Sequence, residues 1–169
     1  MKIFGEFGQG GKMNFKQFLR QTIDKNDIVL DIGSGNRTYH DVPCKRIYGI
    51  DAWRKVKPDF LIDLEVESLP FDENTFDSIM MVDFIEHVSK EAGLRIIEEC
   101  KKITKNRIIL QTPLWWDDNS KNTENPSLWC YGNKYNYHKS LWGIDDFKDW
   151  NRILGIDNLE NYFVGVWDK

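Results

Sequence analysis

An apolar run meets an acid and two closely spaced glycines in VLDIGSGN, residues 29–36. This pattern predicts a buried strand that ends in a tight ligand-binding turn, because Gly33 and Gly35 lack a Cβ atom and allow backbone N–H groups to approach a ligand. Asp31 would face any positive group held at this turn. By itself the pattern also fits an ordinary buried strand that runs into a glycine-rich turn.

Three further acids follow strand-like runs. The segment RIYGID, residues 46–51, places Asp51 about 20 residues after the first turn, where a ribose-binding carboxylate is expected. Residues 59–62 lead into Asp63, and residues 76–82 lead into Asp83. Four successive strands would each deliver a carboxylate at their carboxyl end, which is the edge where ligands bind in an open parallel α/β sheet.

The remaining periodicities complete the expected fold. Helical spacing of apolar residues predicts a lead-in helix over about residues 14–24, and Ser89 can cap a second helix with an apolar stripe. Residues 107–112 are typical of a central fifth strand, residues 145–150 of a short helix, and residues 162–167 of a closing strand. We expect a single α/β domain over residues 1–169, with the lead-in helix inside residues 1–25.

The order and spacing of these motifs resemble the class I S-adenosylmethionine-dependent methyltransferases, in particular small members of the methyltransferase type 11 kind. VLDIGSGN resembles their first motif, GID their ribose acid, IDLEVESLPFDENTFDSI their adenine-side motif, and MVDFIEHV the segment facing the reacting methyl. The resemblance implies a Rossmann-like, doubly wound α/β fold: a mostly parallel seven-stranded sheet with an antiparallel last strand and helices on both faces. It also implies the cofactor S-adenosyl-L-methionine, with S-adenosyl-L-homocysteine as the product.

The same resemblance implies a role for each residue that matches a motif. The implied contacts are Asp31, Gly33 and Gly35 along the methionine part, Asp51 at the ribose, Ala52 and Trp53 at the adenine faces, Asp63 and Leu64 at the adenine edge, and Asp83 near the sulfonium and amino group. The implied cofactor-binding set also includes Ser34, Asn36 and Phe84.

One departure distinguishes this cofactor from NAD. A dinucleotide fingerprint needs a third glycine where this chain has Thr38, followed by a full helix that holds the pyrophosphate. Pro43 leaves room for little more than a two-turn helix before the second strand. NAD is therefore disfavoured, whereas the positive charges of S-adenosylmethionine suit a ring of aspartates.

A long aromatic segment, residues 113–143, follows the fifth predicted strand. We expect it to be ordered, because a solvated loop would not keep its many aromatic side chains exposed. These side chains are Trp115, Trp116, Trp129, Tyr131, Tyr135, Tyr137 and Trp142. In the resembled family an insertion here commonly builds the acceptor pocket, and NKYNYHKSLWGIDDF looks like the HxSxW pattern of one branch. We therefore expect a substrate-side loop.

The candidate catalytic residues are His138, His87 and Asp83. A sulfonium is already an activated methyl donor, so that positioning matters most and a general base is optional. For His87, in the EHV element, a structural role is favoured over catalysis. Two interpretations of His138 stay open: it acts as an acceptor-side base or orienter under an aromatic lid, or it locks the loop to the sheet together with Trp142.

Charge and cysteine content limit the remaining function classes. The net charge of −4 gives no general attraction to nucleic acid. The cysteines Cys44, Cys100 and Cys130 are odd in number without a CxxC pair, which indicates a reduced cytoplasmic location and no cysteine-based metal site. We expect no metal ligands. No apolar run is long enough to span a membrane, and the first residues, with Lys2 and Gly5, lack the apolar core of a signal peptide.

The sequence favours a small-molecule acceptor whose reacting atom is oxygen or nitrogen. Two alternatives stay open. One is a protein or RNA acceptor, although the acidic balance argues against RNA. The other is a non-catalytic S-adenosylmethionine-binding partner subunit, whose aromatic residues would form a homodimer or partner interface.

Overall fold

The computed structural model describes residues 13–169, so the first-residue pattern used in the signal-peptide argument lies outside the described residues. Its centre is a seven-stranded sheet of β1 (Ile28–Ile32), β2 (Arg46–Asp51), β3 (Phe60–Leu61), β4 (Phe76–Val82), β5 (Thr104–Pro113), β6 (Asn151–Arg152) and β7 (Tyr162–Asp168). The strands lie in the order β3-β2-β1-β4-β5-β7-β6. β1 to β5 are parallel, and β7 is antiparallel to both of its neighbours. This topology confirms the expected Rossmann-like fold.

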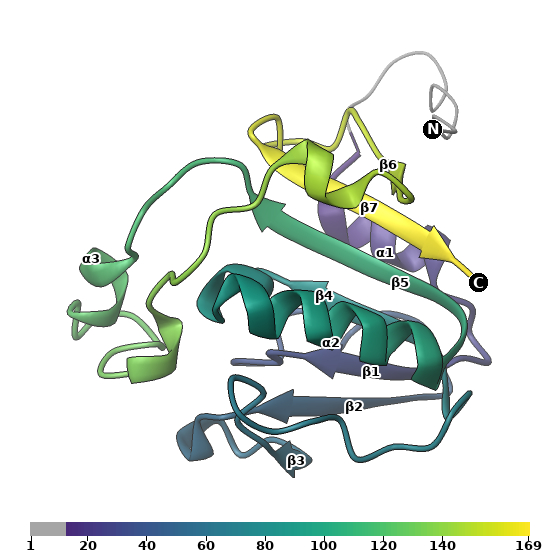
Figure 1. Ribbon diagram of the computed structural model, residues 1–169, viewed down its shortest axis with the longest axis horizontal. Helices are drawn as coiled ribbons and strands as arrows, with labels where there is room; N and C mark the ends of the chain where they lie inside the picture. The colour runs from purple at the N-terminus through teal and green to yellow at the C-terminus, as the bar shows by residue number, and fades with distance from the viewer. Residues whose placement is uncertain (1–12) are drawn as a thin grey trace.

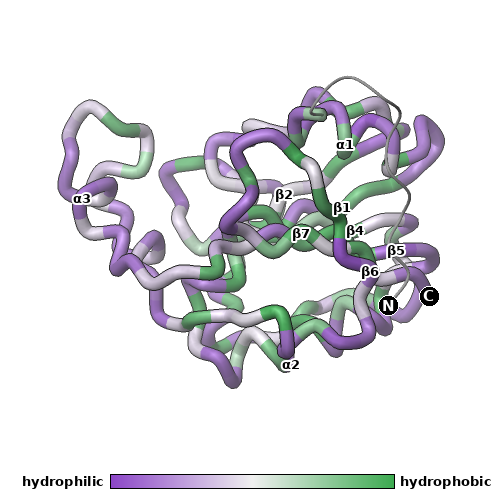
Figure 2. The backbone as a smooth tube through the Cα atoms, turned by 90° about the horizontal axis from the view of Figure 1, so that it is seen from above, coloured by the Kyte–Doolittle hydropathy of each residue, from purple (hydrophilic) through white to green (hydrophobic). Residues whose placement is uncertain are grey.

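Two α-helices cover opposite faces of the sheet (Figure 2): α1 (Phe15–Thr22) and α2 (Lys90–Ile103). α1 begins with a capping box formed by Asn14 and Gln17, and the Ser89 hydroxyl accepts a hydrogen bond from the N–H of Ala92 at the start of α2. These caps satisfy backbone donors that a helix start leaves unpaired. Both predicted helices are confirmed.

Strand alternation divides the core into two layers. Ile79 and Met81 of β4 belong to the cluster under α2, whereas Met80 and Val82 belong to the cluster with α1. Successive strand side chains point to opposite faces, so one buried strand supplies both layers. The doubly covered sheet brings the carboxyl ends of β1, β2 and β4 to one edge.

Residues 36–45 form turns and contain no helix, in agreement with the expectation that Pro43 leaves little room for one before β2. Two other local features differ from the predictions. The helix expected at residues 145–150 is a 3₁₀ turn, η4 (Ile144–Phe147). β6 was not predicted, since two residues are too few to show an alternating pattern.

The segment between β5 and β6 contains one short helix, α3 (Ser120–Thr123), and two 3₁₀ turns, η3 (Lys134–Asn136) and η4. Its first part, with α3, lies beyond the carboxyl ends of the parallel strands at the left of Figure 1, and its end returns to the sheet at β6. The expectation that its aromatic side chains avoid solvent is wrong for four of them. These are Trp115, Trp116, Trp129 and Tyr131, which are between 42% and 56% exposed.

Trp142 anchors the end of this segment to the core. Its ring is 1% exposed, and its Nε1–H donates to the Ile85 carbonyl at 3.2 Å and to the Ser140 hydroxyl at 2.9 Å. The ring also stacks on Phe147, with centroids 5.5 Å apart. A Cβ atom on Gly93 of α2 would lie 2.5 Å from Trp142 Cζ2, so this helix position has room only for glycine. Trp142 thus locks the segment to Ile85 and α2, whereas we expected it to lock the segment to the sheet.

Among residues 13–169, no helix combines the length and apolar character that crossing a bilayer needs.

Candidate functional site

A cavity of about 590 Å³ opens at the carboxyl ends of the parallel strands. Every predicted cofactor-binding residue lines it except Trp53: Asp31, Gly33, Ser34, Gly35, Asn36, Asp51, Ala52, Asp63, Leu64, Asp83 and Phe84. The candidate catalytic residues His87 and His138 line the same cavity as Asp83. The structure therefore brings together residues that are more than 100 positions apart in the chain.

The glycine turn after β1 is shaped by two residues with positive φ. Gly33 has φ +73° and Gly35 has φ +47°, conformations that side chains rarely adopt. The N–H groups of Gly33 and Ser34 both donate to the Ile50 carbonyl at 2.9 Å, which fastens the turn to β2. A Cβ atom on Gly33 would lie 2.5 Å from the ring of Phe84, so the turn also packs directly against the segment after β4.

Asp51, the last residue of β2, accepts two backbone hydrogen bonds. The Gly35 N–H donates to Oδ2 at 2.9 Å, and the Trp53 N–H donates to Oδ1 at 2.7 Å. Burial raises the pKa of this carboxyl, while the two N–H groups oppose that rise. Each carboxylate oxygen has two lone-pair sites, so both oxygens can still accept a hydrogen bond from a ligand hydroxyl.

The carboxylate of Asp31 was predicted to face a positive group of the ligand, but it already has a hydrogen-bond partner within the protein. The carboxylate lies 3.0 Å from His40 Nε2 in the turn region between β1 and β2. Burial raises the pKa of Asp31, and the hydrogen bond to His40 opposes this. Sequence reasoning missed His40, because a lone histidine in a connection of turns carries no pattern. A ligand cation at Asp31 would share the carboxylate with this ring.

Asp83 follows β4 in a left-handed conformation, with φ +47°. Its Oδ1 accepts a hydrogen bond from Gln111 Nε2 at 2.9 Å, and its N–H donates to the Gln111 carbonyl at 3.0 Å. A non-glycine residue in this region stores strain and is common at ligand sites. The two bonds from β5 hold the Asp83 carboxylate at the cavity wall.

Trp129 reaches across from the β5–β6 segment to the glycine turn. A Cβ atom on Gly35 would lie 2.8 Å from Trp129 Cη2, so the indole contacts the turn directly. Trp53, which was predicted to lie at the adenine faces, is not part of the cavity wall. The centroid of its ring lies 6.3 Å from the centroid of the Trp129 ring. Trp129 lines the cavity in its place, which the sequence could not indicate because the two tryptophans are far apart in the chain.

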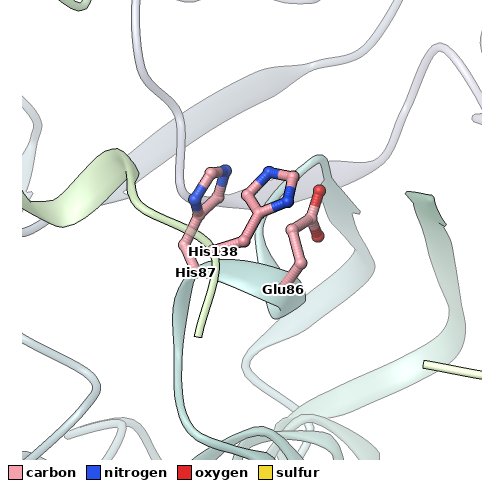
Figure 3. A group of neighbouring side chains, drawn as sticks. All are labelled: Glu86, His87 and His138. Carbon is pink, nitrogen blue, oxygen red and sulfur yellow. The ribbon is translucent and has the colours of Figure 1, made fainter. Parts of the chain in front are cut away.

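Glu86, His87 and His138 form a cluster in the same cavity (Figure 3). Their possible ligand atoms all lie within 4.8 Å of one another, and the His138 ring lies between the other two side chains in the figure. Glu86 and His87 belong to the 3₁₀ turn η2 (Ile85–His87). The N–H of Lys139 donates to the Glu86 carbonyl at 2.7 Å, which brings the neighbouring His138 to this turn.

Burial governs the protonation of this cluster. It raises the pKa of the Glu86 carboxyl well above its usual range, and the charge of Asp83 adds to the rise. Burial and the nearby His138 ring lower the pKa of His87 to about 4. Burial also lowers the pKa of His138, although Asp117 opposes this. Both imidazoles are therefore neutral at pH 7.

The fold and its cavity define a Rossmann-like α/β protein with a cavity at the carboxyl edge of the sheet, which is the edge where such folds bind ligands. The sequence model described as a methyltransferase domain matches residues 30–110, from β1 into β5. A curated protein of Encephalitozoon cuniculi, provisionally named a methyltransferase, is 26% identical over 155 residues, which covers 85% of this chain and 71% of that protein. These matches confirm the resemblance that the motifs indicated: residues 30–110 are similar to a methyltransferase domain.

Three solved structures share the fold. A Bacillus halodurans protein, provisionally named a methyltransferase, has a TM-score of 0.57 and 16% identity over 78% of this chain and 64% of its own. This chain thus spans less than two thirds of that protein. A chain in the Haloferax volcanii complex between the Trm112 methyltransferase activator and a provisionally named methyltransferase also has a TM-score of 0.57, at 14% identity, with coverage of 85% and 83%.

The third structure is a Rhodobacter sphaeroides protein, provisionally named a zinc-dependent alcohol dehydrogenase. It has a TM-score of 0.67 and 10% identity, with coverage of 91% of this chain and 89% of its own. At such low identities all three likenesses establish the fold alone. The reaction has to be argued from the residues of the site.

Proposed function

We propose that the protein transfers a methyl group from S-adenosylmethionine to an oxygen or nitrogen atom of a small-molecule acceptor. The observation that carries this proposal is the cavity itself, in which a glycine turn and the carboxylates of four strand ends line one space. Its volume of about 590 Å³ is within the usual range for sites that enclose a small ligand. We further propose that residues 1–169 act as one domain.

The residues present fit S-adenosylmethionine better than a dinucleotide. The cofactor carries positive charge on its sulfonium and amino groups, which complements the carboxylates of Asp31 and Asp83. Asp51 has free lone-pair sites for the two ribose hydroxyls. A pyrophosphate would instead meet several carboxylates without a full helix N-terminus to compensate for its charge, since residues 36–45 form turns.

S-adenosylmethionine supplies an activated methyl group, so the work of the chain is to bind, orient and exclude water. Precise placement of two reacting groups accounts for roughly 7 to 11 kcal/mol of a barrier. Glu86, His87 and His138 are the groups available to hold or take up a proton of the acceptor, because all three line the cavity. We therefore propose that the acceptor binds in the part of the cavity that these three residues line.

The β5–β6 segment is the proposed acceptor-side cover. Trp115 and Tyr162 both line the cavity, and their rings meet edge to face at 4.7 Å. Trp129 closes the opposite wall against the glycine turn. Such an aromatic enclosure favours a compact acceptor with apolar surface, and the net charge of −4 offers no general attraction to RNA.

A second candidate function rests on the exposed aromatic residues that do not line the cavity. Trp116 and Tyr131 are 56% and 48% exposed, which suits contact with a second copy of the chain or another protein. In this alternative the domain binds S-adenosylmethionine as a partner subunit and performs no transfer.

Incubation with methyl-labelled S-adenosylmethionine and a panel of hydroxyl and amine acceptors tests the proposal. We expect label on one acceptor class and an equal amount of S-adenosylhomocysteine. Binding of S-adenosylmethionine without label transfer to any acceptor, together with a dimer in sedimentation, would favour the partner-subunit alternative.

A further inference from the structure

We propose that Glu86, His87 and His138 bind a divalent transition-metal ion inside the cavity. Their donor atoms lie within 4.8 Å of one another, although the residues come from two segments about 50 positions apart. Within the described residues 13–169, no hydrogen bond joins the three side chains to one another. They therefore converge around a common point without satisfying each other.

The donor set matches a recognised type of catalytic metal site. Two imidazoles and one carboxylate bind zinc in hydrolytic enzymes and ferrous iron in oxygenases, with the remaining positions open. The all-oxygen ligation that calcium and magnesium prefer is absent from this cluster as described. Metal–nitrogen bonds of about 2.1 Å place neighbouring ligand atoms about 3.4 Å apart in a tetrahedral site, so small side-chain rotations would close the cluster on an ion.

Hydrogen bonds to neighbouring groups orient two of the three donor side chains. The Thr112 hydroxyl donates to Glu86 Oε2 at 3.0 Å. His87 Nδ1 lies 3.3 Å from the Tyr137 carbonyl, and when it donates there, Nε2 is left to bind a metal. Metal-binding histidines usually donate their other ring N–H to a carbonyl or carboxylate in this way.

The surroundings of the cluster are negative and sheltered. Asp83 and Asp117 line the same cavity as the three donors. Glu86 is only 2% exposed, so its carboxylate has little access to water. A cation bound in the cluster would therefore lie among carboxyl groups and be largely shielded from bulk water.

The site also indicates an acceptor class, an inference that rests on the proposed function. An ion with three protein ligands keeps open positions, which suit an acceptor with two oxygens on adjacent carbons, at least one of them a hydroxyl. The ion lowers the pKa of the bound hydroxyl: the O–H bond breaks, and the proton leaves to solvent. The oxygen then forms the C–O bond to the methyl group as the C–S bond breaks with its electron pair left on sulfur.

Zinc binding to the chelator-treated full chain tests the metal site. We expect one Zn²⁺ per chain by equilibrium dialysis and elemental analysis, and a loss of affinity of at least about 100-fold in Glu86→Gln, His87→Gln and His138→Gln. His40→Gln is the matched control. The chain has three histidines, and His40 is the one that lies outside the cluster. Equal Zn²⁺ affinity in the cluster variants and the control would overturn the proposal.

Cobalt spectroscopy of the unmodified chain keeps the test independent of variant folding. We expect Co²⁺ to give visible bands that Zn²⁺ abolishes and that a catechol probe shifts, since its two oxygens would enter the open positions. Absence of the bands would overturn the metal site, and bands that catechol leaves unchanged would overturn the acceptor class. Parallel titration with S-adenosylmethionine separates these results from failure of the proposed function, which would remove cofactor binding and leave the cobalt bands.

Discussion

Replacing Gly93 with alanine should destabilise the protein, although alanine is ordinarily the better helix residue. The change alone would favour α2 by about 1 kcal/mol. However, the added Cβ atom would lie 2.5 Å from Trp142 Cζ2, 3.0 Å from Trp142 Cη2 and 3.1 Å from Ile85 Cγ1. Ordinary carbon contacts begin near 3.5 Å, so the indole would have to move.

The indole has little freedom to move. Trp142 is held by hydrogen bonds to the Ile85 carbonyl and the Ser140 hydroxyl, and Phe147 stacks on it. Overpacking a well-filled core costs about 1 to 3 kcal/mol, and the restrained indole places this position in the upper part of that range. After the gain of about 1 kcal/mol in helix propensity is subtracted, we expect Gly93→Ala to lower the free energy of unfolding by about 1 to 2 kcal/mol.

Urea unfolding followed by far-UV circular dichroism measures this change. Trp142→Phe removes the part of the indole that overlaps the new Cβ atom, so in that background Gly93→Ala should cost at least about 1 kcal/mol less. The reasoning is refuted if Gly93→Ala stabilises the protein, or if its cost is the same with and without the indole.

Three further predictions address the site and its support. Asp51→Asn should weaken S-adenosylmethionine binding by about 10- to 100-fold in calorimetry, because it removes a charged hydrogen-bond acceptor. Asp59→Asn is the control, since the Asp59 carboxylate also accepts a hydrogen bond from a backbone N–H but lies outside the cavity wall. This control should leave the affinity for S-adenosylmethionine unchanged. Equal effects of the two variants would contradict the ribose assignment. His138→Ala should lower kcat at least 10-fold in the label-transfer assay with cofactor affinity intact; unchanged turnover would give His138 a structural role only. Partial burial raises the pKa of Asp77, but a backbone N–H and a lysine outweigh it and lower this pKa below 3.8. Asp77→Asn should therefore lower the free energy of unfolding by about 1 to 2 kcal/mol at pH 7. This difference should disappear in unfolding experiments in acid, as the pH falls through the lowered pKa. A difference that persists in acid would show that packing, and not charge, causes the loss.

The strand ends could be predicted because their signals are local. An apolar run followed by an acid occurs within a few residues, and the parallel topology then places Asp31, Asp51 and Asp83 on one edge of the sheet. The caps of α1 and α2 are equally local. The exact boundaries and the shortest elements could not be predicted. β6, for example, is two residues long and is too short to show a pattern.

The far wall of the site could not be predicted, because long-range packing creates it. Trp129 contacts Gly35 although more than 90 positions separate them in the chain, and nothing near either residue indicates the other. The histidine cluster depends on the hydrogen bond from Lys139 to the Glu86 carbonyl, which joins two segments without regular pattern. His40 likewise has no motif that marks it as the partner of Asp31.

Calorimetric titration of the purified chain with S-adenosylmethionine, and separately with NAD, tests the central claim most directly. The account predicts saturable binding of one S-adenosylmethionine per chain and no binding of NAD, because the carboxylate-lined turn lacks a pyrophosphate site. Saturable binding of NAD without binding of S-adenosylmethionine would contradict the proposed function.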